Sequence, residues 1–127
     1  MKKKILVIDD EEDFCYFVKA NLQLYEDNEV LTATSGKKGI QMAYKENPDV
    51  ILLDIIMPGM DGFEILKSLK ADTRTMHIPV IMLTARDDDE SKMLASGLYS
   101  VDYLVKPVET NDLMSKIDKV LSITKLA

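Results

Sequence analysis

The chain has 127 residues, of which 46% are hydrophobic and 30% are charged, and its formal net charge is −6. This length corresponds to one domain, which can bury a core without disulfide or metal staples. Nucleic-acid binding relies on clustered positive charge that displaces counterions. The one basic run, residues 2–4, is short, so direct nucleic-acid binding is not expected.

The single cysteine and the single histidine limit the chemistry that the chain can perform. Cys15 has no cysteine to pair with and stands among apolar residues at helical spacing, so we expect a buried free thiol in a reducing compartment. One histidine, His77, supports neither a zinc cluster nor a Ser-His-Asp triad. No apolar run approaches the ~18 residues of a membrane span, and no signal peptide is recognisable, so the sequence predicts a cytoplasmic protein without membrane contact.

Short apolar runs alternate with segments of helical periodicity along the first half of the chain. Residues 5–8 are all apolar, as expected for a strand that is covered on both faces, and residues 14–22 follow with helical spacing. A weaker strand is predicted at residues 29–33, and Ser35 is a candidate N-cap for the helix after it. The apolar run at residues 50–53 predicts a third strand.

The second half continues the same alternation. A turn at residues 57–62 is indicated by one proline and two glycines. Beyond this turn the sequence predicts, in order, a helix at residues 63–69, a strand at 80–83, a short helix around Met93 and Leu94 that stops near Gly97, a strand at 101–105 and a helix at 113–121.

Five strand–helix units with short connections predict an α/β fold, in which one parallel sheet carries helices on both faces within a single domain of residues 1–127. Ligands of such sheets bind outside the carboxyl ends of the strands. The predicted strand at residues 29–33 ends without a charged group, which indicates that it lies at an edge. We therefore expect the flavodoxin-like strand order 2-1-3-4-5.

Residues that could perform chemistry fall at the ends of the other four strands: Asp9 and Asp10, Asp54, Thr84, and Lys106. One aspartate after a strand is usually a cap or a turn residue, but this joint occurrence indicates a site. Three carboxylates in one pocket repel one another, and such an oxygen cluster suits Mg²⁺. The ammonium and the hydroxyl can hold phosphate oxygens. The pattern predicts phosphoryl transfer to Asp54.

Four stretches of the chain, residues 8–10, 53–62, 83–85 and 103–107, resemble the motifs of the receiver domain of two-component response regulators. The resemblance covers nearly the whole chain. It implies a signalling switch in a phosphorelay, not a conventional turnover enzyme. In such a switch, Asp54 takes a phosphoryl group from the phosphohistidine of a sensor histidine kinase or a histidine phosphotransfer protein.

The resemblance also assigns the metal and phosphate ligands. It implies that Mg²⁺ is held by Asp9, Asp10, Asp54 and the backbone carbonyl of Ile56. It identifies Lys106 as the lysine that binds the phosphoryl group.

A switch between two states is implied by the same resemblance. Thr84 and Ala85 are assigned to phosphate binding, and Thr84 is coupled to Tyr103, which reorients when phosphate arrives. The peptide bond between Lys106 and Pro107 is expected to be cis. A downstream effector or output domain would bind through the last helix and the fifth strand, and homodimer formation is a further option. Both a stand-alone regulator and a receiver joined to other domains fit the sequence.

Two positions beside the predicted site, Ile56 and Arg86, are expected to tune the lifetime of the phosphorylated state, as their counterparts do in receivers. Neither an apolar side chain nor a guanidinium accepts a hydrogen bond from an attacking water. We therefore expect slow self-dephosphorylation. Receivers commonly carry a Gly-Ala pair before the fifth strand, whereas this chain has Tyr99 and Ser100 there, so an altered loop is expected.

Two other functions fit parts of the pattern. A haloacid-dehalogenase-type phosphohydrolase also forms an aspartyl-phosphate, but that class has Asp-x-Asp after its first strand, whereas Asp9 is followed by Glu11 two positions later. The chain also has no room for the cap insertion that this class usually carries. A phosphorylation-independent docking module would be favoured by the loss of Asp54, Thr84 or Lys106, and all three are present.

Overall fold

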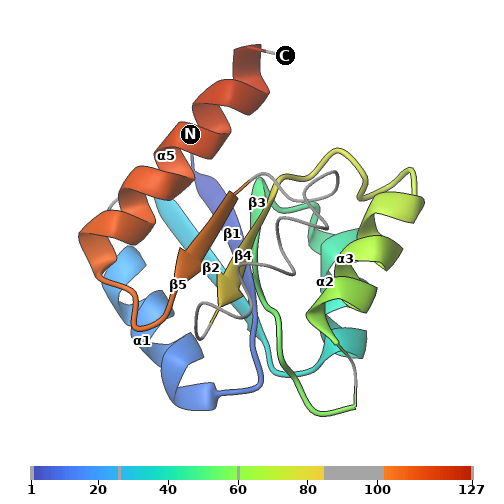
Figure 1. Ribbon diagram of the computed structural model, residues 1–127. Coiled ribbons are helices and arrows are strands. Elements are labelled where there is room, and N and C mark those ends of the chain that lie inside the picture. Colours follow the sequence, from blue (N-terminus) through green and yellow to red (C-terminus); the bar gives the residue numbers. More distant parts are fainter. Residues whose placement is uncertain (1, 26, 60, 85–101, 127) are drawn as a thin grey trace.

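Five parallel strands form one sheet in the computed structural model, which describes residues 2–25, 27–59, 61–84 and 102–126. The elements in chain order are β1 (Lys3–Ile8), α1 (Glu12–Leu22), β2 (Asn28–Ala33), α2 (Gly36–Glu46), β3 (Val50–Asp54), α3 (Gly62–Ala71), β4 (Val80–Thr84), β5 (Asp102–Val105) and α5 (Thr110–Leu126). The strand order is β2-β1-β3-β4-β5 (Figure 1). The predicted α/β fold and strand order are confirmed, with β2 at an edge.

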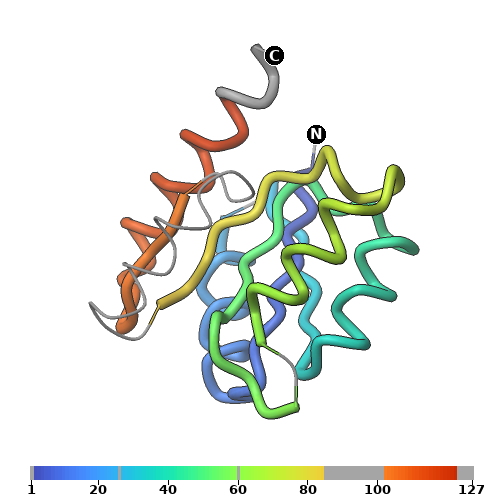
Figure 2. Tube along the Cα trace, turned by 45° about the vertical axis from the view of Figure 1, so that its right-hand side comes forward, coloured from blue at the N-terminus to red at the C-terminus, as the bar shows by residue number. Residues whose placement is uncertain are grey.

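Helices cover both faces of the sheet, as Figure 2 shows from a second direction. Apolar side chains of α1 and α5 pack on one face in a cluster that includes Val18 and Ile117. Those of α2 and α3 pack on the opposite face, in a cluster that includes Ala43 and Leu66. Burial on both faces explains why the central strands read as continuous apolar runs.

Strand β1 shows how this double burial is encoded. Successive side chains of a strand point to opposite faces. Ile5 and Val7 accordingly join the cluster under α1 and α5, whereas Leu6 and Ile8 join the cluster under α2 and α3. All four are fully buried, which explains why this part of β1 is apolar up to Asp9.

The predicted helix boundaries agree with the structure at several points and differ at others. The Ser35 hydroxyl accepts a hydrogen bond from the Lys38 N–H at 3.2 Å, which confirms the predicted N-cap of α2. Helix α5 begins at Thr110, before the predicted residues 113–121. The predicted short helix around Met93 lies outside the described residues. Among the described helices, none combines the length and the apolar character needed to cross a bilayer.

We predict that Ser35→Ala lowers the free energy of unfolding by about 1 kcal/mol, because the substitution leaves an N–H in the first turn of α2 without its side-chain acceptor. Chemical denaturation measures the change. Ser122→Ala, which removes an exposed hydroxyl within α5, is the matched control and is expected to have little effect. Equal destabilisation by both substitutions would contradict the capping role.

Candidate functional site

Three carboxylates converge at the carboxyl end of the two central strands. Asp9 follows β1, Asp54 ends β3, and these strands are neighbours, with Ile8 opposite Leu53. One carboxylate oxygen from each of Asp9, Glu11 and Asp54 lies within 4.8 Å of the others. Asp9 is fully buried, whereas the Glu11 side chain is 64% exposed. The cluster therefore has a closed inner end and an open outer end.

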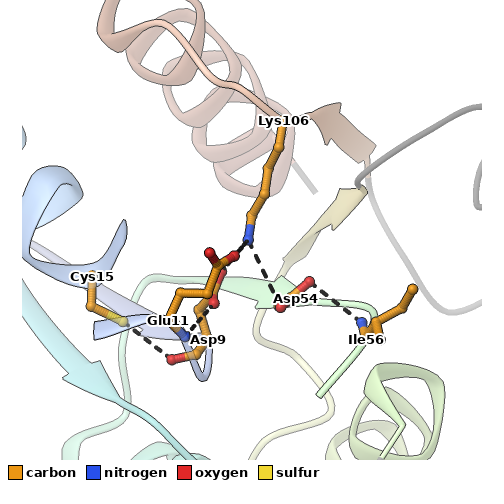
Figure 3. A network of polar contacts seen from close by, with 6 residues as sticks. All are labelled: Asp9, Glu11, Cys15, Asp54, Ile56 and Lys106. Carbon is orange, nitrogen blue, oxygen red and sulfur yellow. Dashed lines mark hydrogen bonds and ion pairs between the residues drawn. The ribbon is translucent and has the colours of Figure 1, made fainter. Parts of the chain in front are cut away.

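The ammonium group of Lys106 lies among these carboxylates (Figure 3). Its Nζ donates to Asp9 Oδ2 at 2.7 Å and to Glu11 Oε1 at 3.0 Å, and it lies 3.8 Å from Asp54 Oδ2. The Phe14 ring lies beneath it, with its centroid 4.4 Å from Nζ. Lys106 comes directly after β5, and its backbone N–H donates to the Thr84 carbonyl at 2.7 Å. The end of the sheet thus positions the lysine.

Burial and charge change the protonation of these groups. Burial, together with the nearby Asp9 carboxylate, raises the pKa of Asp54 from 3.8 to about 7, although Lys106 and the Ile56 N–H oppose this rise. Burial disfavours the ammonium form of Lys106, but its hydrogen bonds to Asp9 and Glu11 outweigh that penalty and raise its pKa. Lys106 therefore stays charged, while Asp54 resists ionisation in the absence of a further cation.

Two further predicted site residues, Thr84 and Tyr103, lie on the adjacent strands β4 and β5. Thr84 is fully buried, and within the described part of the chain its Oγ1 has no hydrogen-bond partner. A buried hydroxyl without a partner is unusual, because such groups lose their hydration. Tyr103 is half-buried on β5, opposite Met82, and packs against the core under α2 and α3. Thr84 ends the strand beside β3 and offers a donor that no described residue uses.

The loop after β3 is held by its backbone. The Ile56 N–H donates to Asp54 Oδ1 at 3.4 Å, and the Gly62 N–H donates to the Ile55 carbonyl at 2.7 Å. A Cβ on Gly62 would lie 2.6 Å from Ile55 Cα, so only glycine fits here. The Ile56 side chain is 62% exposed. The loop thus directs the Ile56 N–H towards Asp54 and leaves the apolar Ile56 side chain exposed beside the site.

Cys15 lies on the buried face of α1, as the sequence predicted. Its thiol donates to the Asp9 carbonyl at 3.3 Å. Burial, reinforced by the Asp9 carboxylate, raises the pKa of the thiol to about 11. The thiol is therefore protonated and inert at neutral pH, and its hydrogen bond contacts the backbone of Asp9.

The acidic cluster of the structure includes one residue, Glu11, that was not among the predicted site residues. Asp10, a predicted metal ligand, is half-buried and lies outside the group of three, in which Glu11 takes a place. The signal for Glu11 was present in the run of four acidic residues that begins at Asp9. The Lys106–Pro107 peptide bond is cis.

Two predicted site residues, Ala85 and Arg86, lie outside the described residues, as do Tyr99 and Ser100.

The chemistry of the donors fits a hard divalent cation. All three groups offer carboxylate oxygens, and the one ammonium among them balances a single negative charge. Oxygen-only ligands of net negative charge suit Mg²⁺. A cation here would have to compete with Lys106 for Asp9.

We predict that Asp54→Asn stabilises the protein above pH 7 when divalent cations are chelated. The pKa of Asp54 is about 7 in the folded protein and near 3.8 when unfolded, so ionisation at high pH favours unfolding. The variant should therefore gain about 4 kcal/mol at pH 8, and this gain should disappear as the pH falls through 7 towards 4.

Chemical denaturation at both pH values tests this expectation. Asp61→Asn is the matched control, because Asp61 is exposed and an amide oxygen can still cap α3. A gain for Asp54→Asn that is equally large at pH 4 and pH 8 would show that Asp54 ionisation is not its cause.

Comparisons with known proteins agree with this arrangement. A family model described as "Response regulator receiver domain" matches residues 5–118. Protein PilH of Pseudomonas aeruginosa is 38% identical over 119 residues, which cover 94% of this chain and 98% of PilH. The alkaline phosphatase synthesis transcriptional regulatory protein PhoP of Bacillus subtilis is 35% identical over 127 residues, which cover 100% of this chain but 52% of PhoP.

Solved structures give the same result. The chemotaxis protein CheY4 of Vibrio cholerae superposes with a TM-score of 0.86 at 31% identity, covering 94% of this chain and 99% of that chain. A response regulator receiver domain protein from Clostridium thermocellum superposes with a TM-score of 0.87 at 36% identity, covering 98% of both chains. This chain therefore belongs to the response regulator receiver domain family of two-component signalling.

Proposed function

We propose that this receiver domain is a phosphorylation switch whose phosphoacceptor is Asp54. The observation that carries the proposal is the position of the Asp54 carboxylate, which ends a buried strand and lies 3.8 Å from the Lys106 ammonium. In the proposed step an Asp54 oxygen attacks the phosphorus of a phosphohistidine. The P–N bond breaks, and the leaving imidazole nitrogen takes a proton. The donor is a sensor histidine kinase or a histidine phosphotransfer protein.

We place Mg²⁺ at Asp9, Asp10, Asp54 and the backbone carbonyl of Ile56. The convergence of Asp9 and Asp54 supports this assignment, and the negative charge of Asp10 reaches Asp54. The bound cation would supply positive charge that offsets repulsion between the incoming phosphoryl group and the carboxylates. It would also favour the ionised form of Asp54, which is the nucleophile.

Lys106 and Thr84 would hold the transferred phosphoryl group. Lys106 carries an ammonium that is 16% exposed, and a charge so shielded from water interacts more strongly with an anion. The Oγ1 of Thr84, for which the described residues provide no hydrogen-bond partner, would gain an acceptor when the phosphoryl group arrives, and we assign Ala85 to the same group of contacts. Tyr103, on the strand beside β4, would then repack and transmit the change to the surface.

The output surface that we propose comprises β5 and α5. A shallow cavity of about 430 Å³ lies there, lined in part by Val105, Lys116 and Lys119. Asp102 pairs with Lys116 at 3.2 Å, so charged groups border the cavity. The relative PhoP is a transcriptional regulatory protein about twice as long as this chain, which suggests an effector or output domain as the partner. A second copy of the chain is the alternative occupant.

We predict that Asp54→Asn abolishes phosphorylation by acetyl phosphate in the presence of Mg²⁺, because an amide is not a nucleophile towards phosphorus. Intact mass spectrometry measures the added phosphoryl group. The Asp61→Asn protein retains Asp54 and should be modified like the parent. Undiminished acid-labile phosphate on Asp54→Asn would exclude Asp54 as the phosphoacceptor.

We place control over the lifetime of the phosphorylated state at Ile56 and Arg86. The exposed apolar side chain of Ile56 gives an attacking water no hydrogen bond, so we expect slow self-dephosphorylation.

We predict that Ile56→Asn accelerates phosphate loss about tenfold, which corresponds to ~1.4 kcal/mol of barrier, because an amide can orient the water. The decay of phosphoprotein after removal of the donor measures the rate. Leu24→Asn, the same change at a residue that is 81% exposed beyond the C-terminal end of α1, is the control. Decay of Ile56→Asn at the rate of the control would contradict the assignment.

A further inference from the structure

Glu11 shares with Asp9 a contact to Lys106 that is found for neither Asp10 nor Glu12. It is the N-cap residue of α1, yet its side chain makes no capping hydrogen bond. Its backbone is fixed instead, because its N–H donates to Asp9 Oδ1 at 2.9 Å and its carbonyl accepts from the Cys15 N–H at 3.1 Å. The side chain reaches across to Lys106 Nζ at 3.0 Å. Glu11 is thus held in place by its backbone and directed towards the site lysine (Figure 3).

Lys106 is held closer to these partners than to Asp54. Its Nζ lies 2.7 Å from Asp9 and 3.0 Å from Glu11, but 3.8 Å from Asp54 Oδ2. A phosphoryl oxygen on Asp54 would therefore compete with these two carboxylates for the donors of the ammonium. Both carboxylates belong to the acidic cluster, but Asp9 is fully buried, whereas Glu11 is exposed and can separate from Lys106.

We propose that Glu11 is a positioning residue that holds Lys106 back from Asp54 in the resting state and so weakens phosphoryl binding until the contact opens. This inference rests on the proposed function of Asp54. Because Glu11 is 64% exposed, the contact is an ion pair of modest strength, which is suited to being exchanged for a phosphoryl oxygen. The chain therefore carries an internal competitor for its own phosphate-binding lysine.

Titration with beryllofluoride, a non-covalent phosphoryl mimic, at saturating Mg²⁺ tests the proposal through binding alone. Glu11→Gln removes the charge but keeps the shape, and we expect it to bind beryllofluoride about threefold more tightly than the parent, as loss of one exposed ion pair allows. Glu12→Gln is the matched control, since Glu12 carries the same charge one residue further on and no contact with Lys106 is found for it. Its affinity should equal that of the parent.

A double-mutant cycle separates contact from bulk charge. In a Lys106→Met background, Glu11→Gln should change the beryllofluoride affinity by less than half of the factor that it causes in the parent, because the partner of Glu11 is gone. The Lys106 ε-methylene NMR signals provide an independent readout without that background. In Glu11→Gln the resting signals should already be shifted towards those of the beryllofluoride-bound parent, and in Glu12→Gln they should not.

Three results would overturn the inference. The first is equal affinity of Glu11→Gln and Glu12→Gln, and the second is an undiminished effect in the Lys106→Met background. The third is resting Lys106 signals in Glu11→Gln that match the parent. A parent protein that binds beryllofluoride no better than Asp54→Asn would instead refute the proposed function, and the inference with it.

Discussion

The ion pair between Lys106 and Asp9 is the interaction on which the rest of the site depends. Two buried carboxylates on adjacent strands would repel each other and lose hydration energy without a counter-charge. Lys106 supplies that charge at 2.7 Å from Asp9, yet it leaves Asp54 only weakly compensated, at 3.8 Å. The raised pKa of Asp54 is the consequence. The resting site is therefore stable but poised to accept more positive charge.

The sheet topology makes this pair possible. Asp9, Asp54, Thr84 and Lys106 come from four adjacent strands in the order β1-β3-β4-β5, and their parallel pairing brings the carboxyl ends to one edge. The hydrophobic clusters on both faces hold these strands in place. The packing of the core therefore positions the polar groups at the ends of the strands. Only the outermost group, Glu11, lies where solvent allows it to move. A switch requires buried groups that stay in place and at least one exposed group that can move.

Much of this arrangement could be predicted from the sequence, because double burial leaves a clear pattern. The apolar runs at residues 5–8, 50–53 and 80–83 predict central strands. The residue after each run is then expected at the carboxyl end of its strand, where the site lies. The presence of Glu11 in the cluster could not be predicted, since it depends on the turn in which the Glu11 N–H donates to Asp9 and its side chain extends to Lys106. The length of α5 was also underestimated, because periodicity marks only the buried positions between Leu113 and Val120.

We infer that, on activation, Lys106 exchanges a carboxylate partner for the group carried by Asp54. A crystal structure of the protein with beryllofluoride and Mg²⁺ tests this claim most directly. We predict that Lys106 Nζ lies within hydrogen-bond distance of a fluorine on Asp54 and has left Glu11. A structure in which beryllofluoride occupies Asp54 while Lys106 keeps both its Asp9 and its Glu11 contacts would contradict it.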